Sequence, residues 1–487
     1  MVFSTMFFLT VFLPPVLFGA WLLRALAAWQ ERRTGLPRNH RLENLWILAA
    51  SLFFYFWGEG WGVFWLVANI IFNATCAAAM SRRQSPGWRK GWLTFAVLGN
   101  LAALGWFKYA GLAARTLNLL PGVSVDIPAV ALPLGISFYT FQAMSYVVDV
   151  YRGTAQPARR AGDFACYVAM FPQLVAGPIV RYTDIAAELE HREWRLEQVA
   201  SGMRRFLCGL AKKALIANGV GAFADKVWEV LAAGSAVPPS LAWLGLLCYT
   251  LQIYYDFSGY SDMAIGLGRM FGFEFQENFL HPYDATSVRD FWRKWHISLS
   301  SWFRDYLYIP LGGSRCGAFR TAINGLVVFG LCGLWHGASW MFLLWGLWHG
   351  VFLMLERPRR KAAPPSGWRA GIGHLYALAV VAFGWILFRS EGWGEVARML
   401  ESLVGTGVAT AQSRLLWMHL SPRMLLIVLV GMIGAFPVAQ WIEARLRRWL
   451  PETAMTTLAW VWATLAGAIA ILDVAAGSYN PFLYFRF

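Results

Sequence analysis

Charged residues are scarce in this sequence, and their scarcity defines the class of protein. Asp, Glu, Lys and Arg make up 14% of the 487 residues, whereas about 25% is usual for a soluble domain. Hydrophobic residues make up 58%, and the chain contains 27 Trp, 35 Phe and 17 Tyr. In water this composition would expose apolar patches far larger than a soluble monomer tolerates. The sequence therefore excludes a soluble globular enzyme and predicts an integral membrane protein.

Several motifs of familiar chemistry are also missing. The sequence has no H-E-x-x-H, no lysine preceded by the glycine that a P-loop requires, and no G-x-S-x-G. These absences argue against a zincin-type metalloprotease, a P-loop ATPase and an α/β-hydrolase, but they leave a transporter open. The six cysteines are widely spaced and form no C-x-x-C pair, so we expect free thiols and no metal site.

Twelve apolar runs are candidate membrane spans, for which about 20 residues are needed. They cover residues 3–28, 45–57, 61–80, 92–108, 127–150, 164–179, 206–231, 323–334, 340–355, 373–388, 424–441 and 457–474. The middle runs are irregular, because 164–179 is interrupted by Pro172 and Pro178 and 323–334 is short. Non-helical backbone at membrane depth is tolerated only where protein or a water-filled cavity satisfies it. We therefore expect re-entrant and interfacial segments there, close to a site.

The positive charge of the chain orients these spans. Net charge is +15, from 42 Lys and Arg against 27 Asp and Glu. The basic residues form short clusters at 32–41, 82–90, 152–160, 357–361 and 445–448. All of these clusters fall on the cytoplasmic side if the N-terminus lies outside, so we predict no nucleic-acid partner. The sequence has no internal repeat, and it predicts a single integral domain over 1–487.

The densest group of polar residues in apolar surroundings lies between Tyr254 and His349. An ionisable group at membrane depth costs about 2.5–3.5 kcal/mol on insertion scales, so such groups usually face an interior cavity. His336 follows a long uncharged run and precedes the small residues Gly337 and Ala338. Because an imidazole can accept a proton from a hydroxyl at neutral pH, His336 is a candidate general base. A core histidine bonded to a carbonyl explains the same pattern.

Other polar residues in this region have two interpretations each. His296 is either a second functional imidazole or part of an interfacial amphipathic helix. The nearby cations either hold the phosphates of a donor or extend to lipid headgroups, and they are Arg289, Arg293, Lys294 and Arg304. Asp256 and Asp262 are either acid–base groups or structural residues. Six residues apart, they do not share one face of a helix, and Asp262 is expected to cap a helix beginning near Met263.

Several motifs occur in this chain in an order that resembles a known family. The motifs are P-L-G-I-S-F-Y at 133–139, G-P at 177–178, D-F-S-G-Y-S-D at 256–262, F-W-R-K-W-H-I-S-L-S at 291–300, R-D-Y-L-Y-I-P-L-G-G at 304–313 and W-H-G at 335–337. Together they resemble the membrane-bound O-acyltransferase family, in particular its branch that takes part in O-acetylation of bacterial alginate. The likeness runs over nearly the whole chain and is most specific at 254–349.

The resemblance implies a fold and a set of site residues. The fold is an all-α, horseshoe-like bundle of about 11–12 transmembrane helices, with re-entrant and interfacial helices around a central tunnel. The catalytic histidines of the family correspond to His336 and His296. The resemblance also implies acetyl-CoA as the donor substrate and no bound cofactor. The residues expected to line the tunnel or bind the donor are Trp335, Trp295, Tyr306, Arg293, Arg304 and Asp256.

The resemblance also implies a cellular setting. It places the protein in the bacterial inner membrane, from which an acetyl group passes to a periplasmic acetyltransferase partner that modifies an exopolysaccharide such as alginate or cellulose. The weakly charged stretches 109–126 and 389–423 are candidate docking surfaces for this partner, with Trp417 and Met418 as contacts. Two other hypotheses are a transporter or flippase for an acyl or polysaccharide intermediate, and a non-catalytic scaffold of an exopolysaccharide synthesis complex.

Overall fold

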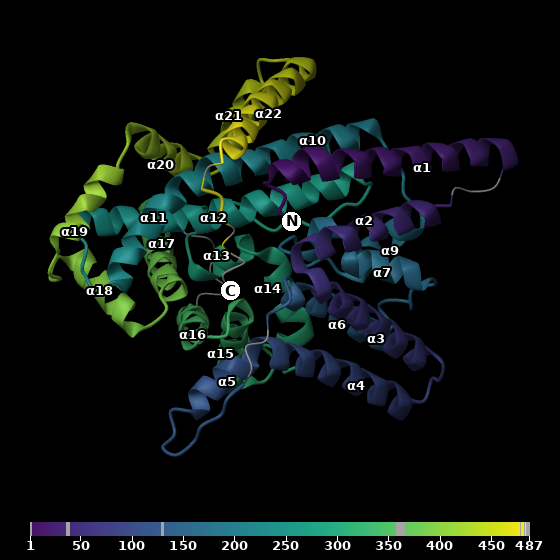
Figure 1. The fold of residues 1–487 in the computed structure, drawn as a ribbon, viewed down its shortest axis with the longest axis horizontal. Helices are drawn as coiled ribbons and strands as arrows, with labels where there is room; N and C mark the ends of the chain where they lie inside the picture. The colour runs from purple at the N-terminus through teal and green to yellow at the C-terminus, as the bar shows by residue number, and fades with distance from the viewer. Residues whose placement is uncertain are drawn as a thin grey trace. The chain divides into compact units, whose positions relative to one another are not determined.

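The computed structural model describes residues 2–35, 39–127, 131–356, 366–477, 479–481 and 483. Within these ranges the chain is helical throughout (Figure 1), and its single extended pairing is an isolated bridge between Ala236 and Ala409. The predicted all-helical fold is thus confirmed for the described residues. The basic cluster predicted at 357–361, and residues 36–38 of the cluster at 32–41, lie outside them.

The helices belong to two compact units. The first unit comprises Met1–Phe206 and Tyr260–Gln276, and the second comprises Leu207–Gly259 and Glu277–Phe487. Helices α10 (Leu196–Ala211) and α12 (Pro239–Met270) contribute residues to both units. The residues that concern the site all belong to the second unit.

The first unit is built on a cluster of phenylalanines. Phe171 packs edge-on against Phe12, with 5.3 Å between ring centroids, and lies 5.5 Å from Phe54. The elements of this unit are η1 (Phe8–Phe12), α1 (Leu13–Thr34), α2 (Arg41–Glu59), η2 (Gly60–Gly62), α3 (Val63–Ser81), α4 (Pro86–Leu104), η3 (Gly105–Tyr109), α5 (Ala110–Leu117), α6 (Ile136–Arg152), α7 (Ala161–Ala169), α8 (Phe171–Leu174) and α9 (Tyr182–Glu190). The expected break in 164–179 falls at Met170, whose non-helical backbone (ψ 112°) separates α7 from α8.

The second unit holds the motif-rich part of the chain. Its elements are η4 (Lys212–Ala217), α11 (Asn218–Ala232), η5 (Pro282–Asp284), α13 (Val288–Lys294), α14 (Ile297–Phe303), η6 (Arg304–Tyr308), α15 (Gly317–His336), α16 (Trp340–Leu355), α17 (Trp368–Arg389), α18 (Trp393–Val404), α19 (Ala411–Arg414), η8 (Leu415–His419), α20 (Pro422–Gly434), α21 (Val438–Leu446) and α22 (Glu452–Ala475). The short helices α13 and α14, with η6, separate the long helix α12 from α15.

Six helical segments among the described residues are long and apolar enough to cross a bilayer. They are Phe8–Thr34, Arg41–Ser81, Leu196–Ala232, Gly317–His336, Trp368–Arg389 and Glu452–Ala475. Helices α20 and α21 pass the same test together but are bent by 68°, as in a broken span or a re-entrant loop. The protein is therefore a multi-pass membrane protein. Fewer segments qualify than the twelve predicted runs, partly because runs 45–57 and 61–80 join across η2 into one segment. Helix α16 is apolar but only 16 residues long.

Helix α12 was not among the predicted spans, and its continuity corrects one expectation. It runs for 32 residues through the whole D-F-S-G-Y-S-D motif. No helix begins near Met263, so the prediction that Asp262 caps one is wrong. Asp262 accepts hydrogen bonds from the Arg205 guanidinium instead, at 2.8 and 3.0 Å. This pairing neutralises a carboxylate that is largely buried.

Glycines allow α15 and α16 to pack very closely. A Cβ atom at Gly333 would overlap the carbonyl oxygen of Phe342, and one at Gly346 would overlap the carbonyl oxygen of Phe329. Only a residue without a side chain lets the two backbones approach to this distance. The two helices are joined by the short link 337–339 and lie side by side (Figure 1). This packing fixes the position of the C-terminal end of α15, where His336 lies.

Candidate active site

One face of α15 leads along the helix to His336. Thr321, Gly325, Val328, Cys332 and His336 follow one another at intervals of three or four residues, and this spacing places them on a single face. His336 is the last residue of the helix and is only 4% exposed. The imidazole thus lies at the buried end of a stripe of mostly small side chains.

Aromatic rings surround the His336 imidazole. The rings of Trp335 and Trp345 each lie 5.0 Å from it, centroid to centroid, and that of Phe388 lies 5.3 Å away. The imidazole of His296 lies 6.4 Å away. The structure therefore brings together the two predicted histidines, although 39 residues of other sequence separate them. Such a cage excludes bulk water, which strengthens any electrostatic interaction within it.

His296 is held in an unusual conformation. Its φ angle is +44°, a left-handed backbone that residues other than glycine rarely adopt. Nδ1 of the ring lies 3.3 Å from Oδ1 of Asn278, which also accepts hydrogen bonds from the backbone N–H and the hydroxyl of Ser298 at 3.2 and 2.9 Å. Because Oδ1 only accepts, the proton of the neutral ring belongs on Nδ1.

The buried position of His296 also determines its charge. The side chain is 0% exposed, and burial lowers its pKa from the ordinary 6.5 to about 3. His296 is therefore neutral at physiological pH, with its lone pair on Nε2. This nitrogen has no hydrogen-bond partner among the residues that the structure describes. A group of such low basicity is better suited to orienting a reactant than to removing its proton.

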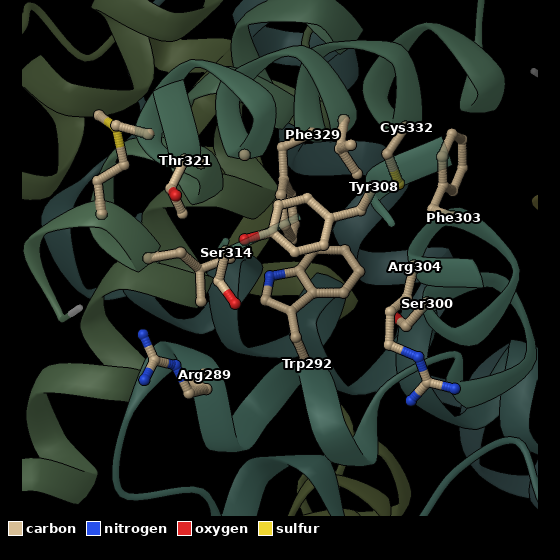
Figure 2. Close-up of a pocket in the computed structure, with 16 residues that line it drawn as sticks. Arg289, Trp292, Ser300, Phe303, Arg304, Tyr308, Ser314, Thr321, Phe329 and Cys332 are labelled. Carbon is tan, nitrogen blue, oxygen red and sulfur yellow. The ribbon is translucent and has the colours of Figure 1, made fainter. Parts of the chain in front are cut away.

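A pocket opens beside this centre. Its volume is about 330 Å³, and its lining is mostly apolar. The lining residues include the α15 stripe up to Cys332, together with Gly350 and Leu353 of α16. Figure 2 shows Arg289 and Arg304 on opposite sides of the Trp292 ring, with the ring of Tyr308 above it in this view. The pocket therefore combines a cationic rim with an apolar wall, and its α15 wall ends one helical turn before His336.

A buried carboxylate fixes one side of this rim. The oxygens of Glu356 accept hydrogen bonds from the backbone N–H groups of Val288 and Arg289, at 2.7 and 2.9 Å. Unsatisfied N–H groups at the start of a helix attract an anion in this way. Glu356 thereby holds the start of α13, from which Arg289 extends. On the other side, Arg304 pairs with Asp305 at 2.6 Å.

Comparison with known proteins identifies the family. The model of the membrane-bound O-acyltransferase family matches residues 51–370, which include both histidines and the whole pocket. The chain is 38% identical to the probable alginate O-acetylase of Azotobacter vinelandii, over 100% of both chains. It belongs to the membrane-bound O-acyltransferase family. It is also 31% identical to the peptidoglycan O-acetyltransferase of Helicobacter pylori, over 100% of this chain and 98% of that one.

The family assignment makes the protein a membrane-bound acyltransferase. A more distant relative in the comparison, the teichoic acid D-alanyltransferase of Bacillus subtilis, is 25% identical over 53% of this chain and 69% of its own. The names of these three relatives refer to acetyl or D-alanyl transfer involving alginate, peptidoglycan and teichoic acid. Within the described ranges, no three His, Cys, Asp or Glu side chains are grouped to hold a metal ion.

The structure brings some of the other predicted site residues to this acyltransferase centre. Trp335 contacts both histidine rings, and its centroid lies 5.9 Å from that of His296. Arg304 lines the pocket. Trp295 is 2% exposed and packs against Phe291 and Trp385 at 5.4 and 5.0 Å, so it belongs to the aromatic core beneath the site.

The remaining predicted residues lie elsewhere in the second unit. The ring of Tyr306 is tilted against that of Trp302, with 5.2 Å between centroids, and it is Tyr308 that lines the pocket. Arg293 is exposed and does not line the pocket. Asp256 is 1% exposed and pairs with Lys213 at 2.5 Å. Its other oxygen accepts a hydrogen bond from the backbone of Leu483 at 2.9 Å, which makes it a structural anchor in this arrangement.

Sequence analysis missed several residues that shape the centre. Trp345 and Phe388 complete the cage around His336, and Trp292 forms a wall of the pocket. The spacing of the α15 stripe was a usable signal, because positions 321, 325, 328, 332 and 336 are visible in the sequence as one helical face. Trp345 and Phe388 gave no such signal in a chain with 27 Trp and 35 Phe.

Proposed function

We propose that this acyltransferase moves an acetyl group from cytoplasmic acetyl-CoA toward the O-acetylation of an exopolysaccharide, with His336 as general base. The observation that carries the proposal is the pocket, whose α15 wall ends one turn before the buried His336 and whose rim holds Arg289 and Arg304. Guanidinium groups bind phosphates well, and the donor carries several. The apolar wall of the pocket suits the less polar arm of acetyl-CoA, which bears the thioester.

The chemistry needs only a base and a site that excludes water. Nε2 or Nδ1 of His336 accepts the proton of an acceptor hydroxyl while the hydroxyl oxygen attacks the thioester carbonyl carbon. The carbon–sulfur bond then breaks, and the thiolate recovers the proton from the imidazolium. The products are an O-acetyl ester and coenzyme A, so protons balance over the cycle. His296 is neutral at physiological pH and orients the reactants beside His336.

The names of the relatives support the proposed acceptor. The Azotobacter and Helicobacter proteins are named for O-acetylation of alginate and of peptidoglycan, which supports a polysaccharide as the final acceptor here. We place the protein in the bacterial inner membrane, with a periplasmic acetyltransferase partner receiving the acetyl group. Trp417 and Met418 are 51% and 80% exposed, so both are accessible for the predicted docking.

The test is transfer of label from radiolabelled acetyl-CoA in membranes that contain the full chain, with a candidate periplasmic partner and polymer supplied. Wild type should transfer label, and His336→Ala should lower the rate by about 10²–10⁴-fold, the usual contribution of a general base. His374→Ala is the matched control, because His374 is a half-buried histidine that bonds the Ala285 carbonyl at 3.1 Å, outside the pocket. It should retain activity.

The other outcomes identify the competing functions. If neither wild type nor His336→Ala transfers label, the acetyl-CoA donor is wrong. If correctly inserted His336→Ala supports normal polymer acetylation in cells, the protein acts as a scaffold. If polymer or acyl intermediate still crosses the membrane at a normal rate in that variant, the transporter hypothesis is favoured.

A further inference from the structure

Gly325 is a glycine of α15 that helix packing does not require. A Cβ atom at this position would meet no atom within 4 Å, and the backbone there is that of a regular helix. Gly333 of the same helix differs, because a Cβ atom there would overlap the carbonyl oxygen of Phe342. A glycine inside a helix is less favourable than an alanine. Neither backbone conformation nor close packing therefore accounts for Gly325.

The open space beside Gly325 belongs to the pocket. Gly325 lines the pocket together with Ala322 and Val328 of the same helix, and the pocket has a volume of about 330 Å³. The described residues that line it include two arginines and no carboxylate, so the pocket favours a ligand that carries negative charge. A side chain at position 325 would take up space that is open to such a ligand.

Gly325 and His336 lie on one line of α15. They are eleven residues apart, which is close to three full turns and about 16 Å along the helix axis. The arm of coenzyme A spans about 15 Å from its sulfur to its first phosphate when extended, since three successive chain bonds reach about 3.5 Å. A donor whose thioester reaches His336 therefore has its first phosphate near Gly325, in a pocket that Arg289 and Arg304 also line.

We propose that Gly325 leaves the opening through which the arm of acetyl-CoA passes just before it joins the diphosphate. The size of the side chain at position 325 then determines whether the donor fits. The inference rests on the proposed function and deepens it, because it assigns one part of the donor to one residue. Gly325 is in this arrangement a specificity-determining residue, and it takes no part in the proton transfer at His336.

The first experiment measures binding to the purified full chain in detergent, together with Tm. Gly325→Leu should raise the Kd of coenzyme A by about tenfold, the usual effect of a poorly fitting group in a pocket, and Gly325→Ala should raise it less. Tm should stay equal or rise, because both residues favour a helix more than glycine does. The Kd of 3′-phosphoadenosine 5′-diphosphate, the nucleotide part of coenzyme A without the arm, should stay within about twofold of the wild-type value.

A matched variant and a truncated donor make the test specific. Gly371→Leu should change no Kd, because a Cβ atom there also meets nothing within 4 Å but Gly371 does not line the pocket. S-acetyl-N-acetylcysteamine carries the thioester and only the last part of the arm, so it ends well short of position 325. With partner and polymer supplied, Gly325→Leu should slow acetyl transfer from acetyl-CoA and leave transfer from the truncated donor at the wild-type rate.

The other outcomes contradict the inference in distinguishable ways. An unchanged Kd of coenzyme A in Gly325→Leu overturns the role of Gly325 alone and leaves the proposed function standing. A fall in Tm that accompanies the rise in Kd means that the glycine serves packing, and it also overturns the inference. Equal slowing with both donors places the damage at His336 and does the same. If wild type does not bind coenzyme A, the proposed donor fails and this inference fails with it.

Discussion

Oδ1 of Asn278 lies 3.3 Å from Nδ1 of His296 and fixes the tautomer of that ring. The same oxygen accepts from Ser298, so the amide cannot turn without losing these bonds. His296 is thereby held neutral, in a left-handed backbone, beside the ring of His336. A strained residue with a fixed tautomer, next to the aromatic cage around His336, is typical of a site organised before the substrate arrives.

The neutral state of His296 predicts a dependence of stability on pH. The pKa of this ring is about 3 in the folded protein because of burial, and about 6.5 in an unfolded chain. Between these values the unfolded state binds one more proton, so stability is complete above pH 6.5 and falls as pH decreases toward 3. The slope from this single group is at most about 1.4 kcal/mol per pH unit.

Thermal unfolding at pH 7, 6, 5 and 4 checks this expectation. In His296→Asn, which removes the titrating group and keeps a residue that tolerates positive φ, the fall in Tm toward pH 4 should be shallower than in wild type. Parallel curves for the two proteins would contradict a depressed His296 pKa.

The close approach of α15 and α16 predicts a strong effect of adding one methyl group. In Gly346→Ala the new Cβ would overlap the Phe329 carbonyl, so the helices must separate. Overpacking of this kind costs about 1–3 kcal/mol, and displacement of α15 moves His336 within its cage. We expect a lower Tm and loss of acyl transfer. Gly371→Ala on α17 is the control, because a Cβ there meets nothing within 4 Å; it should keep both Tm and activity.

The motifs at 254–349 were predictable because ionisable groups stand out in an apolar chain. His336 and His296 were both found this way, and the structure brings their rings within 6.4 Å. Helix α12 was missed for the related reason that Gln252, Asp256 and Asp262 lower the hydropathy of a continuous 32-residue helix. The two carboxylates pair with Lys213 and Arg205, which are distant in sequence, and no local pattern reveals such partners.

The sequence also does not show which of several similar charged residues faces the pocket. Arg289 and Arg293 are one helical turn apart on a seven-residue helix, yet only Arg289 lines the pocket. Asp256, another residue predicted for the site, is paired with Lys213 at 2.5 Å. Which charge is paired and which faces a ligand depends on tertiary packing, because both types of residue have the same local signature.

The Lys213–Asp256 pair predicts a double-mutant result. Both side chains are 2% exposed, so Asp256→Asn leaves a buried ammonium without its counter-ion. Removing one partner of such a pair costs about 3–5 kcal/mol, and Tm should fall steeply. Lys213→Met combined with Asp256→Leu removes both charges and should be more stable than Asp256→Asn. A double variant that is less stable than the single one would contradict this interpretation of Asp256.

The carboxylate of Glu356 predicts a link between a helix cap and donor binding. In Glu356→Gln one of the two acceptor oxygens becomes an NH₂ group, so the backbone N–H of Val288 or Arg289 loses its partner. A buried donor left unsatisfied costs about 1–3 kcal/mol, and the start of α13 should loosen. Because Arg289 extends from this turn into the pocket lining, the Kd of 3′-phosphoadenosine 5′-diphosphate should rise several-fold.

Binding of this nucleotide to purified protein, measured together with Tm, separates the cap from a general loss of fold. Glu395→Gln is the matched control, since Glu395 accepts one backbone N–H from Glu391 at 3.1 Å at an exposed helix start. It should change neither quantity appreciably. A lower Tm with an unchanged nucleotide Kd in Glu356→Gln would mean that the cap stabilises α13 without positioning Arg289, and that the phosphates are held by Arg304 instead.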